Sequence, residues 1–121
     1  MDGRRAWLLT ADVAALQAAE LPRGVRLIGG YDPYLAARDR ELLLPDGALR
    51  KRLWRTLANP GAVLRDGELA GTWRATRKGK RLVVAVEPFG SRLRGSKRAL
   101  ADEAATLAPW RGAERAELTG V

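Results

Sequence analysis

Two closely spaced turn signals constrain the fold of this chain more than any other feature of its sequence. Asp66-Gly67 and Lys78-Gly79-Lys80 separate three apolar segments at residues 62–64, 69–73 and 82–88. An Asp-Gly pair between apolar segments is the strongest short-range signal for a β-hairpin, because the turn needs residues that tolerate positive φ. Pro88 ends the third segment, since proline cannot donate a hydrogen bond within a central strand. The sequence therefore predicts an antiparallel meander of three strands.

The rest of the chain predicts short strands and helices around this meander. Strands are expected at residues 5–9, 25–28 and 113–118, helices at residues 11–20 and 97–108, and a segment with one apolar side at residues 48–55. Thr10 and Ser96 are the expected N-caps of the two helices, because their hydroxyls can accept a hydrogen bond from the first turn. The apolar sides are formed by Val13, Leu16 and Ala19, by Leu49, Leu53 and Trp54, and by Leu100, Ala104 and Leu107.

The length of 121 residues is that of one ordinary domain, large enough to bury a modest core without disulfides. We therefore expect a single domain, residues 1–121, of the α+β class. Its architecture is predicted to be an antiparallel β meander or small barrel-like sheet with two to three flanking helices.

The chain contains neither Cys nor His. Thiolate nucleophiles, Ser-His-Asp triads and the commonest metal ligands are therefore excluded. No spacing matches a metal site, a Walker loop or a dinucleotide-binding loop, so no metal and no cofactor are expected. No apolar run approaches the roughly 20 residues of a membrane span, and the N-terminus lacks a signal-peptide pattern. We expect a cytoplasmic, nucleoid-associated protein that does not contact membranes.

The positive charge of the chain is concentrated in its middle. Residues 50–98 carry fourteen bases and three acids, a net of +11. Residues 1–49 carry six bases and seven acids, and residues 99–121 carry two bases and four acids, giving nets of −1 and −2. A basic segment of this kind favours a polyanion such as DNA as the partner, and the alternative is a merely solubilising basic face.

Two groups of cations are the candidate DNA-binding residues. The first surrounds the second predicted turn and consists of Arg74, Arg77, Lys78, Lys80 and Arg81; the second consists of Arg50, Lys51 and Arg55. A basic hairpin tip can approach phosphate from both flanks, as a wing does. Its alternative role is to prevent edge-to-edge strand pairing. The second group supports DNA binding only if it shares a face with the first.

Other polar and aromatic residues favour structural roles. The alternating charges Arg38-Asp39-Arg40-Glu41 are typical of structural ion pairs. Tryptophans 7, 54, 73 and 110 can stack on bases, but core packing is the favoured role for each.

An ordered set of motifs resembles a known family. The set begins with Val25-Arg26-Leu27-Ile28, Tyr31-Asp32-Pro33-Tyr34 and residues 38–46, and continues with Asn59-Pro60-Gly61, Asp66-Gly67, Gly71-Thr72-Trp73-Arg74 and Val86-Glu87-Pro88-Phe89. It is similar to the C-terminal region of bacterial winged helix DNA-binding domain-containing proteins, which are related to the AlkZ-like DNA glycosylases. The resemblance covers nearly the whole chain.

The resemblance implies tandem winged helices followed by a β-rich, barrel-like C-terminal domain, which together form a basic DNA channel for repair of alkylated or crosslinked DNA. The family's catalytic motif is a Gln followed two residues later by Gln or Asp. Here Gln17 is followed by Ala19, so no catalytic residue carries over. The chain is expected to correspond to the terminal module, after the winged-helix region. The family-signature residues Tyr31, Asp32, Pro33, Arg38, Asp39 and Arg40 are expected to be structural.

Three functions follow from these observations. The leading hypothesis is a DNA-binding module that grips the phosphate backbone through a basic surface and is not an enzyme on its own. The second is a non-catalytic interaction domain that pairs with a winged-helix protein or with itself. The third is a part of a DNA glycosylase that acts in alkylation or crosslink repair.

Overall fold

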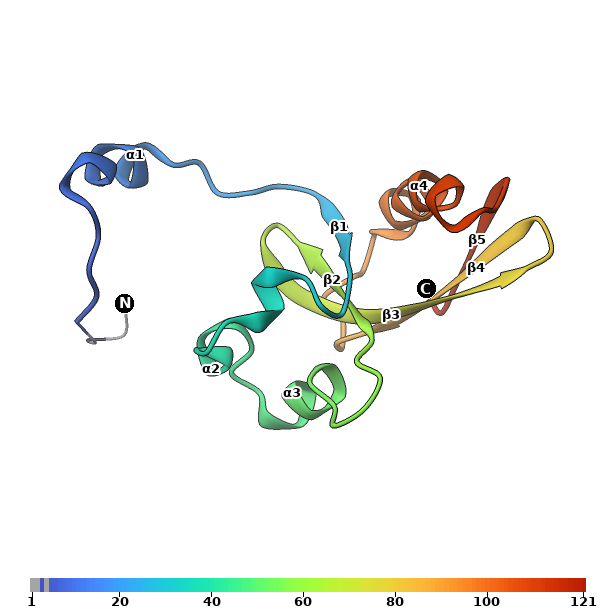
Figure 1. Ribbon diagram of the computed structural model, residues 1–121, viewed down its shortest axis with the longest axis horizontal. Helices are drawn as coiled ribbons and strands as arrows, with labels where there is room; N and C mark the ends of the chain where they lie inside the picture. Colours follow the sequence, from blue (N-terminus) through green and yellow to red (C-terminus); the bar gives the residue numbers. More distant parts are fainter. Residues whose placement is uncertain (1–2, 4) are drawn as a thin grey trace.

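A five-stranded sheet forms the body of the protein in the computed structural model, which describes residue 3 and residues 5–121 (Figure 1). The strands follow one another in chain order: β1 (Val25–Ile28), β2 (Gly61–Arg65), β3 (Glu68–Lys78), β4 (Arg81–Pro88) and β5 (Arg115–Thr119). The pairs from β1 to β4 are antiparallel, whereas β5 pairs with β4 in parallel. The predicted α+β class is confirmed, with a mixed sheet.

The predicted meander is present as β2, β3 and β4. Asp66 and Gly67 have φ values of 51° and 81°, and Gly79 has a φ of 61°, so both turns use the left-handed conformations that their residue types tolerate. β4 ends at Pro88, as predicted. Local turn chemistry therefore determines this part of the sheet.

The other regular elements are short helices. They are η1 (Thr10–Asp12), α1 (Val13–Ala18), η2 (Pro33–Ala36), α2 (Arg40–Leu43), α3 (Gly47–Leu53), α4 (Lys97–Leu107) and η3 (Pro109–Arg111). No helix in the described part of the chain is both long and apolar enough to span a membrane.

Helix α4 closes the curled sheet, because it contacts both edge strands, β1 and β5. Leu100 and Ala104 are buried against the sheet, as the predicted apolar face requires. On the β1 side, the Leu27 backbone N–H donates to Glu103 Oε2 at 3.1 Å, so a side chain of α4 satisfies part of the open strand edge. The helix is also the crossover that lets β5 run parallel to β4.

Two apolar clusters cover opposite faces of the sheet. Val63 belongs to the cluster under α4, and its neighbour Ala62 belongs to a second cluster with Leu53 of α3 and Phe89. Adjacent strand residues point to opposite faces, so α3 and α4 pack on different sides of β2. The second cluster positions α3.

Several local predictions are wrong at the N-terminus of the chain and at α4. Residues 5–9 form no strand, and the helix expected at residues 11–20 is only η1 followed by α1. Every residue of these segments is exposed, and a short isolated helix is marginal in water. Thr10 is itself inside η1 and caps nothing. Ser96 occupies the N-cap of α4, but its φ of −98° and ψ of 3° lie outside the extended region that directs a cap, and its side chain makes no capping hydrogen bond.

Candidate nucleic-acid interface

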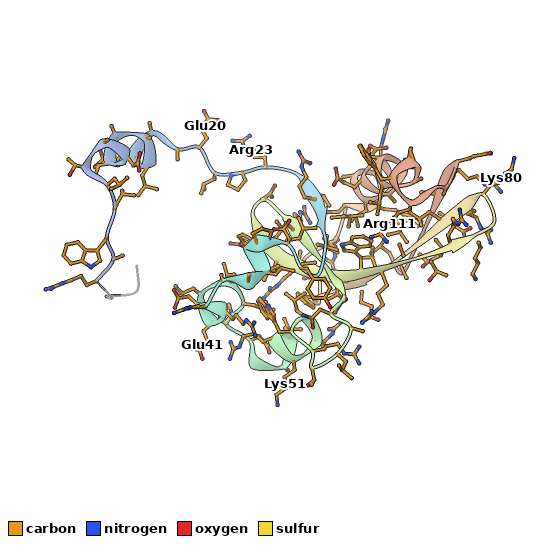
Figure 2. The ribbon with its side chains drawn as sticks, in the orientation of Figure 1. Glu20, Arg23, Glu41, Lys51, Lys80 and Arg111 are labelled. Atoms are coloured by element: carbon orange, nitrogen blue, oxygen red, sulfur yellow. The ribbon has the colours of Figure 1, made fainter. Side chains whose placement is uncertain are left out.

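Helix α3 carries Arg50 and Lys51 of the second predicted group, and Arg55 follows two residues after the end of the helix. Asp46 Oδ1 accepts from the backbone N–H groups of Ala48 at 2.8 Å and Leu49 at 3.1 Å, which caps the helix. Leu53 is buried in the cluster beneath it. With its apolar side fixed on the sheet, α3 directs its remaining side chains toward solvent, and Figure 2 shows Lys51 pointing away from the body.

One flank of α3 borders a groove of about 990 Å³ that is rich in cations. Its lining includes Arg38, Arg40, Arg50 and Lys51, together with Asp39, Glu41 and Trp54. The Arg40 guanidinium lies 5.1 Å from the centroid of the Trp54 ring, whose Nε1–H donates to Leu35 O at 2.9 Å. Arg50 Nη1 donates to Leu44 O at 2.8 Å and to Pro45 O at 2.6 Å, which commits that residue to holding the loop before α3.

Arg38 and Lys51 are the cations of this groove that remain available to a ligand. Within the described part of the chain neither has an ion-pair partner. The flat face of the Arg40 guanidinium lies on the Trp54 indole, which leaves its N–H groups able to donate to a ligand. This contact fixes the orientation of the guanidinium before a ligand binds. The groove therefore offers one cation held on an indole ring and two cations without an ion-pair partner among the described residues.

The other flank of α3 brings together cations from distant parts of the sequence. Arg52, Arg55 and Arg74 line a small cavity of about 70 Å³ with Glu87 and Trp73. Arg52 Nη2 lies 3.4 Å from Glu87 Oε2, and Arg74 Nη2 donates to Ala58 O at 2.7 Å. Arg74 of the first predicted group thus lies beside Arg55 of the second, across the surface of the sheet. We call the two flanks together the α3 basic surface: Arg38, Arg40, Lys51, Arg52, Arg55 and Arg74.

The β3–β4 hairpin carries the rest of the first predicted group, and most of its cations already have partners. Lys80 Nζ lies 3.1 Å from Glu114 Oε1, and Arg81 Nη1 lies 2.9 Å from Glu117 Oε2. Arg77 Nη1 donates to Gly112 O at 3.2 Å, whereas Lys78 has no partner among the described residues. Figure 2 shows Lys80 at the far end of the hairpin, well away from Lys51.

The sequence did not predict that acidic residues at β5 pair with the cations of the hairpin. Glu114 and Glu117 follow Lys80 and Arg81 by more than thirty residues in the sequence, and the parallel pairing of β5 places them beside these cations. The only available signal was the acidic excess of residues 99–121. Apart from Arg74, the first predicted group of cations therefore lies on a surface separate from that of the second group.

Part of the family-signature segment holds local structure in place. Asp32 Oδ1 accepts from the Tyr34 N–H at 2.9 Å and caps η2, which begins at Pro33. The Tyr34 hydroxyl donates to Gly67 O at 3.4 Å, and burial, followed by the negative charge of Glu68, raises the pKa of this phenol. Tyr31 is largely exposed. The segment thus connects η2 to the β2–β3 turn.

The four tryptophans divide into two pairs. Trp73 is buried and its Nε1–H donates to Ile28 O at 2.9 Å, and Trp54 is half-buried beside α3. Trp7 and Trp110 are 89% and 85% exposed, so the prediction of core packing is wrong for these two. Trp7 lies on a segment that packs on no other element, and Trp110 lies in the exposed η3 turn.

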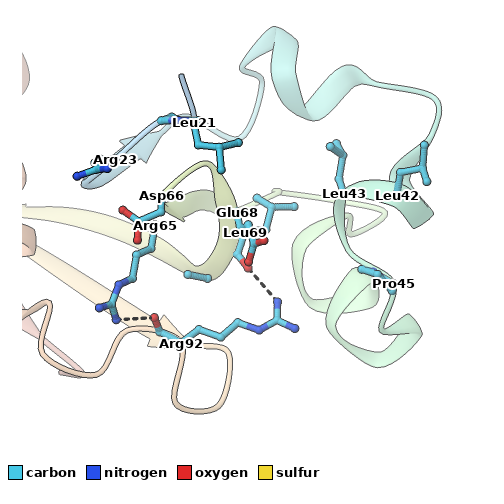
Figure 3. Close-up of a pocket in the computed structure, with 12 residues that line it drawn as sticks. Leu21, Arg23, Leu42, Leu43, Pro45, Arg65, Asp66, Glu68, Leu69 and Arg92 are labelled. Carbon is cyan, nitrogen blue, oxygen red and sulfur yellow. Dashed lines mark hydrogen bonds between the residues drawn. The ribbon is translucent and has the colours of Figure 1, made fainter. Parts of the chain in front are cut away.

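A further groove, of about 1040 Å³, lies between the start of β1, the β2–β3 turn and α2 (Figure 3). Arg92 Nη1 donates to Leu69 O at 2.9 Å, and Arg65 Nη1 donates to Arg92 O at 3.0 Å. Both guanidinium groups are held by backbone carbonyls and serve the fold. Within the described residues there is no cluster of three or more potential metal ligands.

Comparisons with known proteins place this basic fold in a family. A family model described as "DNA glycosylase AlkZ-like" matches residues 1–110. The interstrand DNA cross-link repair glycosylase of Streptomyces sahachiroi is 31% identical over an alignment that covers 95% of this chain and 30% of that protein. The solved structure of Streptomyces sahachiroi DNA glycosylase AlkZ superposes with a TM-score of 0.77 at 30% identity, covering 98% of this chain and 32% of the other. The chain thus spans about a third of the length of these relatives. The resemblance seen in the sequence is confirmed: the chain belongs to the AlkZ-like DNA glycosylase family.

Proposed function

We propose that this chain is a DNA-holding part of an AlkZ-like glycosylase in crosslink repair, and that the α3 basic surface is its principal contact with the phosphate backbone. The observation that carries the proposal is the convergence of six cations from three segments around one fixed helix. Phosphate contacts from Lys and Arg supply most of the affinity of sequence-independent DNA binding. Membership of a DNA glycosylase family supports DNA as the polyanion.

The hairpin tip is proposed as a second, weaker contact. Lys78 is available there, whereas Lys80 and Arg81 share their charge with Glu114 and Glu117. An ion-paired cation attracts phosphate less, because the neighbouring carboxylate repels the same phosphate. The hairpin is expected to add affinity once a duplex lies on the α3 basic surface.

The chain has few amide side chains with which to recognise individual bases. Asn59 and Gln17 are the only amides in the sequence. Asn59 Oδ1 already accepts from the Arg55 backbone N–H at 2.7 Å. Amide side chains that could make bidentate contacts to adenine are therefore scarce, and we expect binding to depend mainly on charge. Base excision is assigned to the larger glycosylase and not to this chain alone.

The test is a titration of duplex DNA at several salt concentrations with two charge-reversal variants. Lys51→Glu with Arg55→Glu changes the α3 basic surface, and Arg111→Glu with Arg115→Glu makes the same change of net charge on η3 and β5. We expect the first pair to weaken binding at least about tenfold more than the second and to reduce the salt slope by about one per lost phosphate contact.

Two results would contradict the proposal. Equal losses in both variants would show that net charge, and not the α3 basic surface, controls binding. Binding of the unchanged chain that is insensitive to salt would exclude a phosphate-backbone contact altogether.

A further inference from the structure

The segment of residues 5–21, the N-terminal arm, presents apolar side chains to solvent. Trp7 is 89% exposed, Leu9 73%, Leu16 64% and Leu21 86%. Figure 1 shows α1 standing away from the sheet and from the other helices. Several exposed large apolar side chains within one short segment are unusual for a surface that stays in water and are typical of an interaction site.

The base of the arm is anchored to the body. The Gly24 N–H donates to Asp66 Oδ1 at 2.8 Å, and the Asp66 N–H donates to Gly24 O at 2.8 Å. The Pro22 ring packs against the β2–β3 turn so closely that a Cβ on Gly67 would collide with it. The arm therefore leaves the body at a defined point and carries its apolar side chains outward from there.

The composition of the arm indicates a protein surface and not DNA as its partner. Its charged residues are Arg5, Asp12 and Glu20, a net of −1, so it offers phosphate no attraction. A helix of six residues such as α1 is not stable in water without tertiary contacts. An apolar surface that packs on Leu9 and Leu16 would supply those contacts.

The family comparison identifies that surface. The family match begins at residue 1, and the solved AlkZ structure matches 98% of this chain, so the arm lies within the shared architecture. About two thirds of that structure lie outside the match. We propose that the N-terminal arm docks on the region of an AlkZ-like glycosylase that corresponds to those two thirds.

The groove in Figure 3 continues this docking surface. Leu21 at the end of the arm and Leu42, Leu43 and Pro45 near α2 line the same groove. This groove shares no lining residue with the α3 basic surface. The inference is thus independent of the proposed DNA contact.

The test places this chain and the unmatched two thirds of a relative in one polypeptide. A chimera is made from the Streptomyces sahachiroi glycosylase by replacing its matching third with these 121 residues, and amide hydrogen exchange is measured without DNA. We expect arm amides to exchange at least about tenfold more slowly in the chimera than in the free chain, because burial protects them. Leu9→Asp with Leu16→Asp should abolish this protection, whereas Leu57→Asp, which changes an equally exposed leucine of the body, should not.

Two outcomes would overturn the inference. One is fast exchange of the arm in a chimera whose β3 and β4 amides remain protected. The other is an arm-dependent dimer of the free chain in sedimentation experiments, which would make a second copy the occupant. Since neither measurement uses DNA, failure here is distinguishable from failure of the proposed function.

Discussion

Glu103 is the residue through which α4 holds the open edge of β1. Its carboxylate accepts from the Leu27 N–H at 3.1 Å and lies 3.7 Å from Arg26 Nη1. Glu103→Ala should lower the free energy of unfolding by about 1–3 kcal/mol, because the strand loses a charged acceptor. Asp102→Ala on the exposed side of the same helix should change it by less than about 0.5 kcal/mol. Urea denaturation of both variants checks this, and equal effects would contradict the edge-capping role.

A substitution at Gly61 tests how closely Trp73 packs on β2. A Cβ at Gly61 would collide with the indole nitrogen of Trp73 and with Ile28 O, the two groups that hydrogen-bond to each other at 2.9 Å. Gly61→Ala should therefore destabilise the fold by about 1–3 kcal/mol, as overpacking does. Gly29→Ala is the matched control, since a Cβ there meets open space and should shift stability by less than about 1 kcal/mol. Thermal unfolding should give a clearly lower melting temperature for Gly61→Ala than for Gly29→Ala.

At the scale of elements, the parallel strand β5 restrains the charge of the hairpin, and releasing that charge should strengthen DNA binding. Glu114→Gln with Glu117→Gln frees Lys80 and Arg81 from carboxylates at 3.1 and 2.9 Å. We expect affinity for duplex DNA to rise roughly three- to tenfold at low salt. The exposed ion pairs themselves contribute less than about 1 kcal/mol to folding.

The control for this gain makes the same change of net charge on the N-terminal arm. Asp12→Asn with Glu20→Gln adds two units of charge far from the hairpin. Fluorescence anisotropy should show a smaller gain for the arm variant. Identical gains would mean that the hairpin makes no localised contact with DNA.

The elements that local chemistry specifies were predictable, and those that depend on distant partners were not. The Asp66-Gly67 turn and Pro88 determine the meander within a short stretch of chain, and both behave as predicted. The direction of β5 depends on α4 crossing the sheet, which no local signal encodes. Residues 5–9 carry strand-like alternation but have no strand to pair with, so they remain irregular.

At the scale of the whole molecule, the candidate site was only half predictable. The sequence groups cations by their position along the chain, but the fold brings together different ones. Arg55 lies with Arg74, and Lys51 lies with Arg38 and Arg40. Arg38 and Arg40 were expected to be structural, and only the fold of residues 30–46 against α3 places them at the groove. Charge density along a sequence therefore indicates a polyanion partner without locating its surface.

The proposed division between a body that contacts DNA and an arm that contacts protein predicts the behaviour of a deletion. Removal of residues 5–21 takes away no buried side chain, since every residue of that segment is exposed. The melting temperature should change by less than about 3 °C, because no packing is lost. Affinity for duplex DNA should stay within about twofold, because the deleted segment has a net charge of only −1. Calorimetry and anisotropy on the deletion variant check both expectations. A large loss of stability would show that the arm packs on the body in solution, and a large loss of affinity with intact stability would place DNA, and not protein, against the arm.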